Sequence, residues 1–508
     1  MEKKAIQRGD KVREFRKTQK RHLETIAKLK RVNCKLKKSV DNKGDATPIE
    51  QAENTNNIPE KQLVRILCIQ LSINGVISYR SIPRILESCK LTIPFQLNWI
   101  PHFTSVINWT LRLGLGLLKQ VEPISKPWVA IIDHSIDIGT KKALVVLRVT
   151  AESLSKRGGA LQLQDCECIG LSVSEKVTGE TISPELQDVF SQSGQPIAII
   201  KDTDATLNKG VRLCFEKQEK FVPVIDDIGH AMANALKAQF EKTPCYKSFC
   251  NQLSYGAKCL RQTDLAFLTP PKLRSKGRFQ SISNLGKWGT RILDVFAVKG
   301  CASKGSILER IRKAFPDLIK SRNFIERFAL TSKVTSDVMK ILKNKGLDKE
   351  TYKQCYELSK QLPRNSKVKK SLLEWLNRNI GVQKQLGISQ PLIVSSDIIE
   401  SLFGKFKYAI ERSPQADMNR TVLLIPALCG NINADISTQA LNQASCLDLE
   451  MWEKENIPYT IRKRRQAFLN QEKNPKSGEI LCELNEISTA YGHPSSPKQN
   501  PEPCRHFR

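Results

Sequence analysis

Apolar runs that lead into acidic residues constrain this fold more than any other feature of the chain. The run 128–132 is followed by Asp133, and the run 196–201 is followed by Asp202. Each run predicts one buried β-strand. A carboxylate at the end of a buried strand is costly unless a partner offsets its charge. We therefore expect the two acids to share a compensating partner.

Strand and helix patterns alternate between residues 123 and 241, which indicates an α/β fold. The predicted strands are 126–133, 144–149, 168–177, 196–202 and 221–227, and the predicted helices are 183–193, 206–219 and 229–241. A hairpin turn near Gly139 joins the first two strands. This order predicts one mixed sheet, with three antiparallel strands first and with the fourth strand beside the first.

Helical patterns dominate the rest of the chain and suggest its organisation. Small helices with helix-turn-helix character predict an all-α DNA-binding domain, although such three-helix units also occur as plain structural modules. A long helical stretch without strand-like runs predicts an insertion into the sheet domain. The predicted segments are a basic helix with a polar linker (1–59), the DNA-binding domain (60–122), the first part of the core (123–241), the helical insertion (242–390), the second part of the core with C-terminal helices (391–469) and a disordered tail (470–508).

The charge of the chain indicates its partner. Lys and Arg number 81 against 51 Asp and Glu, which gives a formal charge of +30. Such an excess repels itself unless a polyanion offsets it. We expect no membrane partner, because the sequence lacks both a long apolar run and a secretory signal. Nucleic acid is therefore the predicted partner, and the 15 scattered cysteines favour free thiols in a reducing cytosol.

Asp133, Asp202 and Glu400 are the candidate catalytic residues, because each emerges from an apolar element. A set of oxygen ligands suits Mg²⁺ or Mn²⁺. Two such ions about 4 Å apart can activate a water or a 3′-hydroxyl and stabilise the leaving oxygen of a phosphodiester. For any one of these acids alone, a helix cap or a surface carboxylate is the alternative.

In this order the motifs resemble those of the DDE transposases of insertion sequences, which have an RNase H-like catalytic core. The resemblance covers residues 60–435, and its motifs are Ile132-Asp-His-Ser-Ile136, Asp202-x-Asp204, Asp227-Ile-Gly-His230, Arg261-Gln-Thr-Asp-Leu-Ala-Phe-Leu268 and Ser396-Asp-Ile-Ile-Glu-Ser-Leu-Phe-Gly-Lys405. It implies that Asp133, Asp202 and Glu400 bind two Mg²⁺ or Mn²⁺ ions.

The second acid departs from the family pattern, in which Asp-x-Gly-x-Asp is common. Here the sequence is Asp202-Thr-Asp204, so Asp204 could replace or join Asp202, which we favour because it follows the strand directly. Asp397 is expected to cap the helix or to support the ligands from behind. Asp227 and His230 lie at a strand–helix junction and are predicted to support the ligands, with DNA contact as the alternative.

Basic and aromatic residues along the chain are candidates for DNA contact. The set comprises Arg80, Arg112, Lys272, Arg274, Lys276, Arg278, Trp288, Lys405 and Lys407. Trp288 would stack on a flipped base, as in some transposases of this class, and packing in the insertion core is its alternative. For the loop 272–278 the alternative is a solvated surface.

These features predict a DNA transposase that cleaves DNA at transposon ends and transfers the strand into target DNA. The implied partners are the inverted repeats and the target DNA, bound by a homodimer or higher oligomer. The expected location is a prokaryotic cytoplasm, in association with the nucleoid. A related nuclease without strand transfer, or an inactive transposase-derived DNA-binding protein, is the alternative function.

Overall fold

The computed structural model describes residues 60–92, 97–134, 141–216, 222–272, 279, 282–298, 300–410, 418–458 and 460–469. The chain divides into two compact units, residues 1–63 and 64–508, and only Glu60–Leu63 of the first unit are described. The predicted basic helix and linker (1–59) and the predicted tail (470–508) lie outside the described residues.

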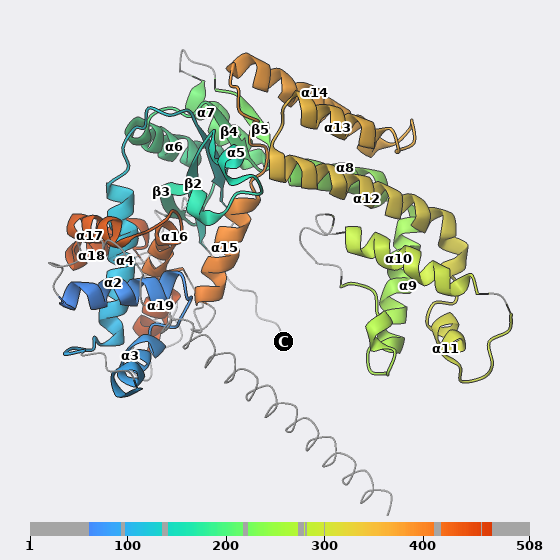
Figure 1. Cartoon of the computed structure of the whole chain (residues 1–508), viewed down its shortest axis with the longest axis horizontal. Coiled ribbons are helices and arrows are strands. Elements are labelled where there is room, and N and C mark those ends of the chain that lie inside the picture. Colours follow the sequence, from blue (N-terminus) through green and yellow to red (C-terminus); the bar gives the residue numbers. More distant parts are fainter. Residues whose placement is uncertain are drawn as a thin grey trace, which may run out of the picture. The chain divides into compact units, whose positions relative to one another are not determined.

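A five-stranded mixed sheet organises the α/β part of the chain (Figure 1). Its strands are β1 (Trp128–Asp133), β2 (Lys142–Thr150), β3 (Glu167–Ser174), β4 (Ala198–Lys201) and β5 (Val224–Asp226), in the order β3-β2-β1-β4-β5. The pairs β1–β2 and β2–β3 are antiparallel, whereas β1–β4 and β4–β5 are parallel. The α/β class, the mixed sheet and the place of the fourth strand beside the first are therefore confirmed.

Side chains alternate between the two faces of the sheet along each strand, and both faces are buried. Ala130 and Ile132 of β1 belong to a core with α6 (Gly179–Ser193) and α7 (Ala205–Phe215). Val129 and Ile131 belong to a second core, which includes the apolar face of α15 (Asp397–Ile410). The strand that carries Asp133 is thus fixed from both sides.

Three helices occupy the predicted DNA-binding region: α2 (Glu60–Ile73), α3 (Ser81–Thr92) and α4 (Phe103–Lys119). Most of their buried apolar side chains from Val64 onward join the same core as the sheet, and Leu111 and Leu115 of α4 join a smaller cluster with residues of the C-terminal helices. Eight of the 17 residues of α4 are buried, and the helix packs against α16 (Leu424–Ala427), α17 (Ala434–Gln443) and α18 (Cys446–Asn456). Only Thr104 and Lys119 of α4 are exposed, so the helix offers little surface to a DNA groove.

Glycines let α4 approach its neighbours closely. A Cβ atom at Gly114 would lie 1.7 Å from the carbonyl oxygen of Leu423, which is backbone and cannot rotate away. We expect Gly114→Ala to lower the free energy of unfolding by about 2–3 kcal/mol, as overpacked sites do. Chemical denaturation measures this, with Gly381→Ala as the control because a Cβ atom there meets nothing within 4 Å. Equal stability of the two variants would contradict the close packing.

Helices form the described part of the predicted insertion (242–390), where Leu347 in an isolated bridge is the only described residue in β-pairing. They are α9 (Pro244–Leu260), α10 (Ser283–Phe296), α11 (Ile307–Ala314), α12 (Arg322–Lys345), α13 (Lys349–Ser359) and α14 (Lys367–Leu386), and α8 (Ile228–Phe240) precedes them. Phe240, Phe249 and Phe328 pack in a core of their own. The long helix α12 connects this core to that of the sheet, because Val334 belongs to the first and Val338 to the second.

The remaining elements are short. They are α5 (Ser153–Arg157), α19 (Ile461–Leu469) and the 3₁₀ turns η1 (Leu163–Asp165), η2 (Ala266–Leu268), η3 (Leu318–Ser321) and η4 (Arg420–Leu423). No described helix is both long and apolar enough to cross a membrane. No disulfide joins the described cysteines.

The predicted start of one helix is wrong. The sequence predicts a helix from Ser183 with a proline in its first turn, but α6 starts at Gly179 and contains Pro184 in its interior. The reason is a reciprocal cap, in which Thr178 and Thr181 satisfy each other's backbone N–H groups.

Candidate active site

Asp133 and Asp202 lie side by side at the ends of neighbouring parallel strands. Ile132 of β1 pairs with Lys201 of β4, and each acid is the next residue of its chain. Asp133 is buried, with 7% of its surface exposed, whereas the side chain of Asp202 is 30% exposed. The strand ends thus bring together two acids that lie far apart in the sequence.

Glu400 reaches this place from α15. The apolar face of that helix, including Ile399 and Phe403, packs into the core beside β1. The segment just before α15 is fixed by a backbone hydrogen bond, in which Ile228 N–H donates to the carbonyl of Val394 at 3.2 Å. The Glu400 side chain remains 47% exposed and can reach a substrate.

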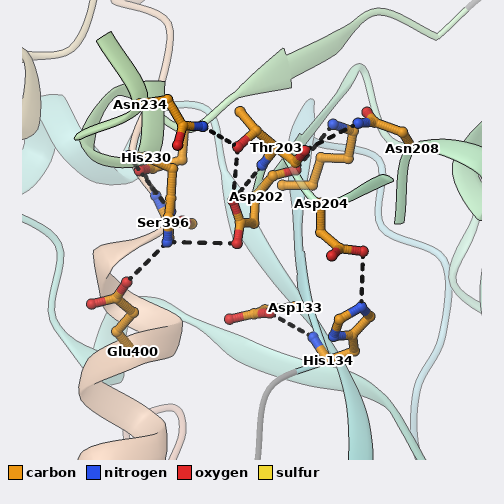
Figure 2. Close-up of polar contacts among 12 residues, drawn as sticks. Asp133, His134, Asp202, Thr203, Asp204, Asn208, His230, Asn234, Ser396 and Glu400 are labelled. Atoms are coloured by element: carbon orange, nitrogen blue, oxygen red, sulfur yellow. Dashed lines mark hydrogen bonds and ion pairs between the residues drawn. The ribbon is translucent and has the colours of Figure 1, made fainter. Parts of the chain in front are cut away.

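His230 links the second and third acids. Its Nε2 atom lies 3.6 Å from Asp202 Oδ2 and 3.6 Å from Glu400 Oε1. Figure 2 shows the ring between the two carboxylates, with Asp133 nearby. The structure therefore brings together all three predicted catalytic acids and places His230, predicted as a supporting residue, in contact with two of them.

Asp227 holds His230 and the start of α15 in place. Its carboxylate is 1% exposed and accepts hydrogen bonds from His230 N–H and Ser396 N–H, both at 2.7 Å. Its Oδ2 atom also lies 3.2 Å from His230 Nδ1. One buried carboxylate thus fixes the element that carries His230 and the one that carries Glu400.

The protonation of this cluster follows from its burial and its charges. Burial raises the pKa of Asp133 to about 6, although the backbone N–H of His134 counteracts the shift. Burial also raises the pKa of Glu400 above its usual range. Burial alone would lower the pKa of His230, but Asp227, Asp202 and Glu400 raise it to about 9. The cluster therefore holds a cationic imidazole among acids at neutral pH.

The raised pKa of Asp133 predicts a pH-dependent cost to stability. Between pH 3.8 and about 6 the folded state retains a proton that the unfolded state loses, so stability falls as pH rises through this window. Asp133→Asn removes this cost, because the Asn side chain stays neutral at every pH. Its neighbours His134, Asp202 and His230 are unchanged. Without divalent metal, we expect the variant to gain about 2–3 kcal/mol over wild type at pH 7.5 and almost nothing at pH 4. Urea denaturation at both values checks this, and a difference independent of pH would contradict it.

Asp204 has a different environment from Asp202. It caps α7, where its Oδ1 accepts the N–H groups of Thr206 at 2.8 Å and Leu207 at 3.2 Å. His134 Nε2 lies 3.2 Å from the same oxygen. Burial alone would raise the pKa of Asp204, but these donors lower it below its usual range. The contacts give Asp204 a structural role and favour Asp202 as the ligand.

This difference predicts that substitutions at Asp204 and at Asp202 have different effects. Ser is also a good helix cap, so Asp204→Ser should cost less than about 1 kcal/mol of stability and leave the DNA cleavage predicted from the sequence close to wild type. Asp202→Asn should abolish cleavage, because it removes a charge that faces the cluster. A cleavage assay with both variants decides the matter, and loss of cleavage in Asp204→Ser would make Asp204 the ligand.

A cavity of about 650 Å³ opens beside Glu400. Its lining includes Gln162, Met339 of α12 and Lys343 of α12. Lys343 forms an ion pair with Asp397, which ties α12 to the first turn of α15. Asp397 therefore anchors the first turn of the Glu400 helix at the wall of the same cavity, and Lys343 is a basic residue there that the sequence did not indicate.

A charged network behind the site was also missed. Lys201 is 1% exposed, and its Nζ donates to Asp226 Oδ1 at 2.8 Å and to the carbonyl of Asp202 at 3.1 Å. Arg378 of α14 donates to Asp226 Oδ2 at 3.0 Å. The available signal was a lysine inside an apolar strand, because such a charge requires a buried partner.

The structure places two of the DNA-contact candidates in internal contacts. Arg112 donates to the carbonyls of Ala444 at 2.6 Å and Leu441 at 2.7 Å, which satisfies the end of α17. Trp288 packs edge-on against Phe315 and donates to the carbonyl of Leu268 at 2.9 Å. These placements support structural roles and lend no weight to DNA contact by Arg112 or Trp288.

The other basic candidates lie at separate places. Arg80 is exposed and its guanidinium lies over the ring of Phe103, and Lys272 is exposed. Lys407 lies two turns beyond Glu400 on the same face of α15, whereas Lys405 points away and is half-buried, which lowers its pKa. Arg274, Lys276 and Arg278 lie outside the described residues.

The donor set suits a hard divalent cation, since Asp133, Asp202 and Glu400 supply carboxylate oxygens and the burial of Asp133 needs an offsetting charge. In this conformation, however, no three His, Cys, Asp or Glu side chains of the described residues form a ready-made metal site. No protein-family model and no curated protein sequence matches the chain.

Proposed function

We propose that the protein is a DNA transposase of the DDE type, with an RNase H-like core formed by the mixed sheet and α15. The observation that carries this proposal is the convergence of Asp133, Asp202 and Glu400 on one cluster. These acids come from two parallel strands and a helix that follows the insertion. Their order along the chain is that of the DDE transposases that the sequence resembles, and their meeting in space is what strand cleavage by a carboxylate site requires.

The protein residues have separable tasks in this proposal. Asp133, Asp202 and Glu400 would hold two Mg²⁺ or Mn²⁺ ions, which when bound activate a water or a 3′-hydroxyl and stabilise the leaving oxygen. Asp227 positions the elements that carry His230 and Glu400. Lys407 and Lys343 lie near Glu400, where they would contact the DNA backbone. The same site can serve hydrolysis and strand transfer, because both are displacements at phosphorus.

The excess of positive charge supports DNA as the partner, and the region 60–122 is proposed to contribute to DNA binding. Since only two residues of α4 are exposed, this contribution falls to the surfaces of α2 and α3, where Arg80 lies just before α3. Binding of a homodimer or higher oligomer to inverted repeats is part of the same proposal.

A DNA cleavage and joining assay tests the function. It combines purified protein, Mg²⁺ or Mn²⁺, a target plasmid and a labelled duplex that carries the DNA flanking the coding region. A transposase nicks the duplex at a fixed position and joins the freed 3′ end to a target plasmid. Nicking without joining would support a related nuclease instead. A shift of the labelled duplex without nicking would support a DNA-binding protein without catalysis.

A further inference from the structure

His230 is arranged as a ligand would be, and not only as a support for the acids. Its Nε2 atom is 3.6 Å from a carboxylate oxygen of Asp202 and 3.6 Å from one of Glu400. Two donors that bind one ion at about 2.1 Å lie about 3–4 Å apart. The spacing from the imidazole nitrogen to each acid is therefore the spacing of ligands that share an ion.

The other ring nitrogen faces a buried carboxylate. His230 Nδ1 lies 3.2 Å from Asp227 Oδ2, and Asp227 is buried and fixed by two backbone N–H groups. In metal sites a carboxylate on one histidine nitrogen directs the lone pair of the other toward the ion. With Asp227 on the Nδ1 side of the ring, Nε2 lies toward the space that Asp202 and Glu400 face (Figure 2).

The side chains of the two acids are more exposed than the imidazole ring. The side chains of Glu400 and Asp202 are 47% and 30% exposed, whereas that of His230 is 20% exposed and bounded by Asp227. Small movements of the two carboxylates would open room for an ion while the imidazole stays in place. This accounts for the absence of a ready-made metal geometry among the described residues.

We infer that His230 releases its Nε2 proton to solvent and binds, through that nitrogen, the divalent ion held by Asp202 and Glu400. The site then has mixed nitrogen and oxygen donors and prefers Mn²⁺ to Mg²⁺, because imidazole suits transition metals and Mg²⁺ favours oxygen. The inference rests on the proposed function only in requiring a metal at this cluster. The opposing possibility is that a charged His230 occupies the place of the cation and competes with it.

Mn²⁺ binding to the full chain without DNA distinguishes His230 as a metal ligand from His230 as a competing cation. Pulsed electron paramagnetic resonance of the wild-type complex should show direct coupling to an imidazole ¹⁴N. His230→Ala should abolish that coupling and weaken Mn²⁺ binding at least about tenfold, with a smaller effect on Mg²⁺. His102→Ala is the control, since His102 caps α4 and contacts Thr104.

Absence of nitrogen coupling in the wild type would overturn the inference, and this result needs no variant to fold. Equal or tighter Mn²⁺ binding by His230→Ala would also overturn it, because removal of a competing cation has that effect. Failure of the proposed function looks different: a protein that binds Mn²⁺ through His230 but never cuts DNA refutes only the transposase. A protein that cuts DNA with Mn²⁺ bound by oxygen alone refutes only the nitrogen ligand.

Discussion

Glu400→Gln is expected to reduce DNA strand cleavage at least about a thousandfold, a loss of about 4 kcal/mol in transition-state stabilisation. The amide keeps the size of the side chain and its place on α15, but it cannot supply the negative charge that a divalent ion requires. Single-turnover cleavage of a labelled duplex in Mg²⁺ and in Mn²⁺ measures the effect. DNA binding should remain or become tighter, because the variant removes a negative charge from the site.

Glu180→Gln provides the matched control for this change. Glu180 lies in the first turn of α6 and forms an exposed ion pair with Lys209, so its substitution should leave cleavage unchanged. Cleavage by Glu400→Gln at the rate of this control would remove Glu400 from the site.

Asp227→Ala is expected to lower the free energy of unfolding by about 3–5 kcal/mol, because it breaks a buried charged network and leaves its partners unpaired. The carboxylate is 1% exposed and serves Ser396 N–H and His230 at once. The variant should also lose cleavage activity in the fraction that remains folded, because the starts of α8 and α15 lose their common anchor. Denaturation in urea, followed by circular dichroism, measures the stability.

Asp348→Ala is the control that shows how much stability is lost when a helix cap that is only partly buried is removed. Asp348 also caps a helix, α13, with its Oδ1 atom accepting Thr351 N–H at 2.8 Å, but it is only partly buried. Loss of this cap should cost about 1 kcal/mol. If Asp227→Ala costs no more than Asp348→Ala, Asp227 is an ordinary helix cap.

The positions of Asp133, Asp202 and Glu400 could be predicted because they depend on patterns within short segments. Two apolar runs followed by acids indicate strand ends, and adjacent parallel strands end at the same edge of a sheet. The helix with Glu400 is marked by acids in its first turns and an apolar face. These local signals were sufficient for the α/β class and for the proximity of the three acids.

The rest depends on packing between distant segments. Nothing in the sequence around Lys343 indicates that α12 brings it to Asp397, because this contact spans 54 positions. The burial of α4 depends on α16 and α17, which lie far along the chain. The position of His230 between two acids depends on the angle at which α8 leaves β5. Such angles are set by the whole core and not by local propensity.

We propose that this protein joins DNA strands through the cluster of Asp133, Asp202 and Glu400. Sequencing of donor–target junctions after a transposition assay tests it most directly, with wild type and Asp202→Asn expressed beside a donor plasmid that carries the flanking DNA. We expect wild type to give junctions in which the same element ends are joined to target DNA between short target duplications, and Asp202→Asn to give none. Junctions formed equally by Asp202→Asn, or absent from wild type although the protein binds the element ends, would contradict the claim.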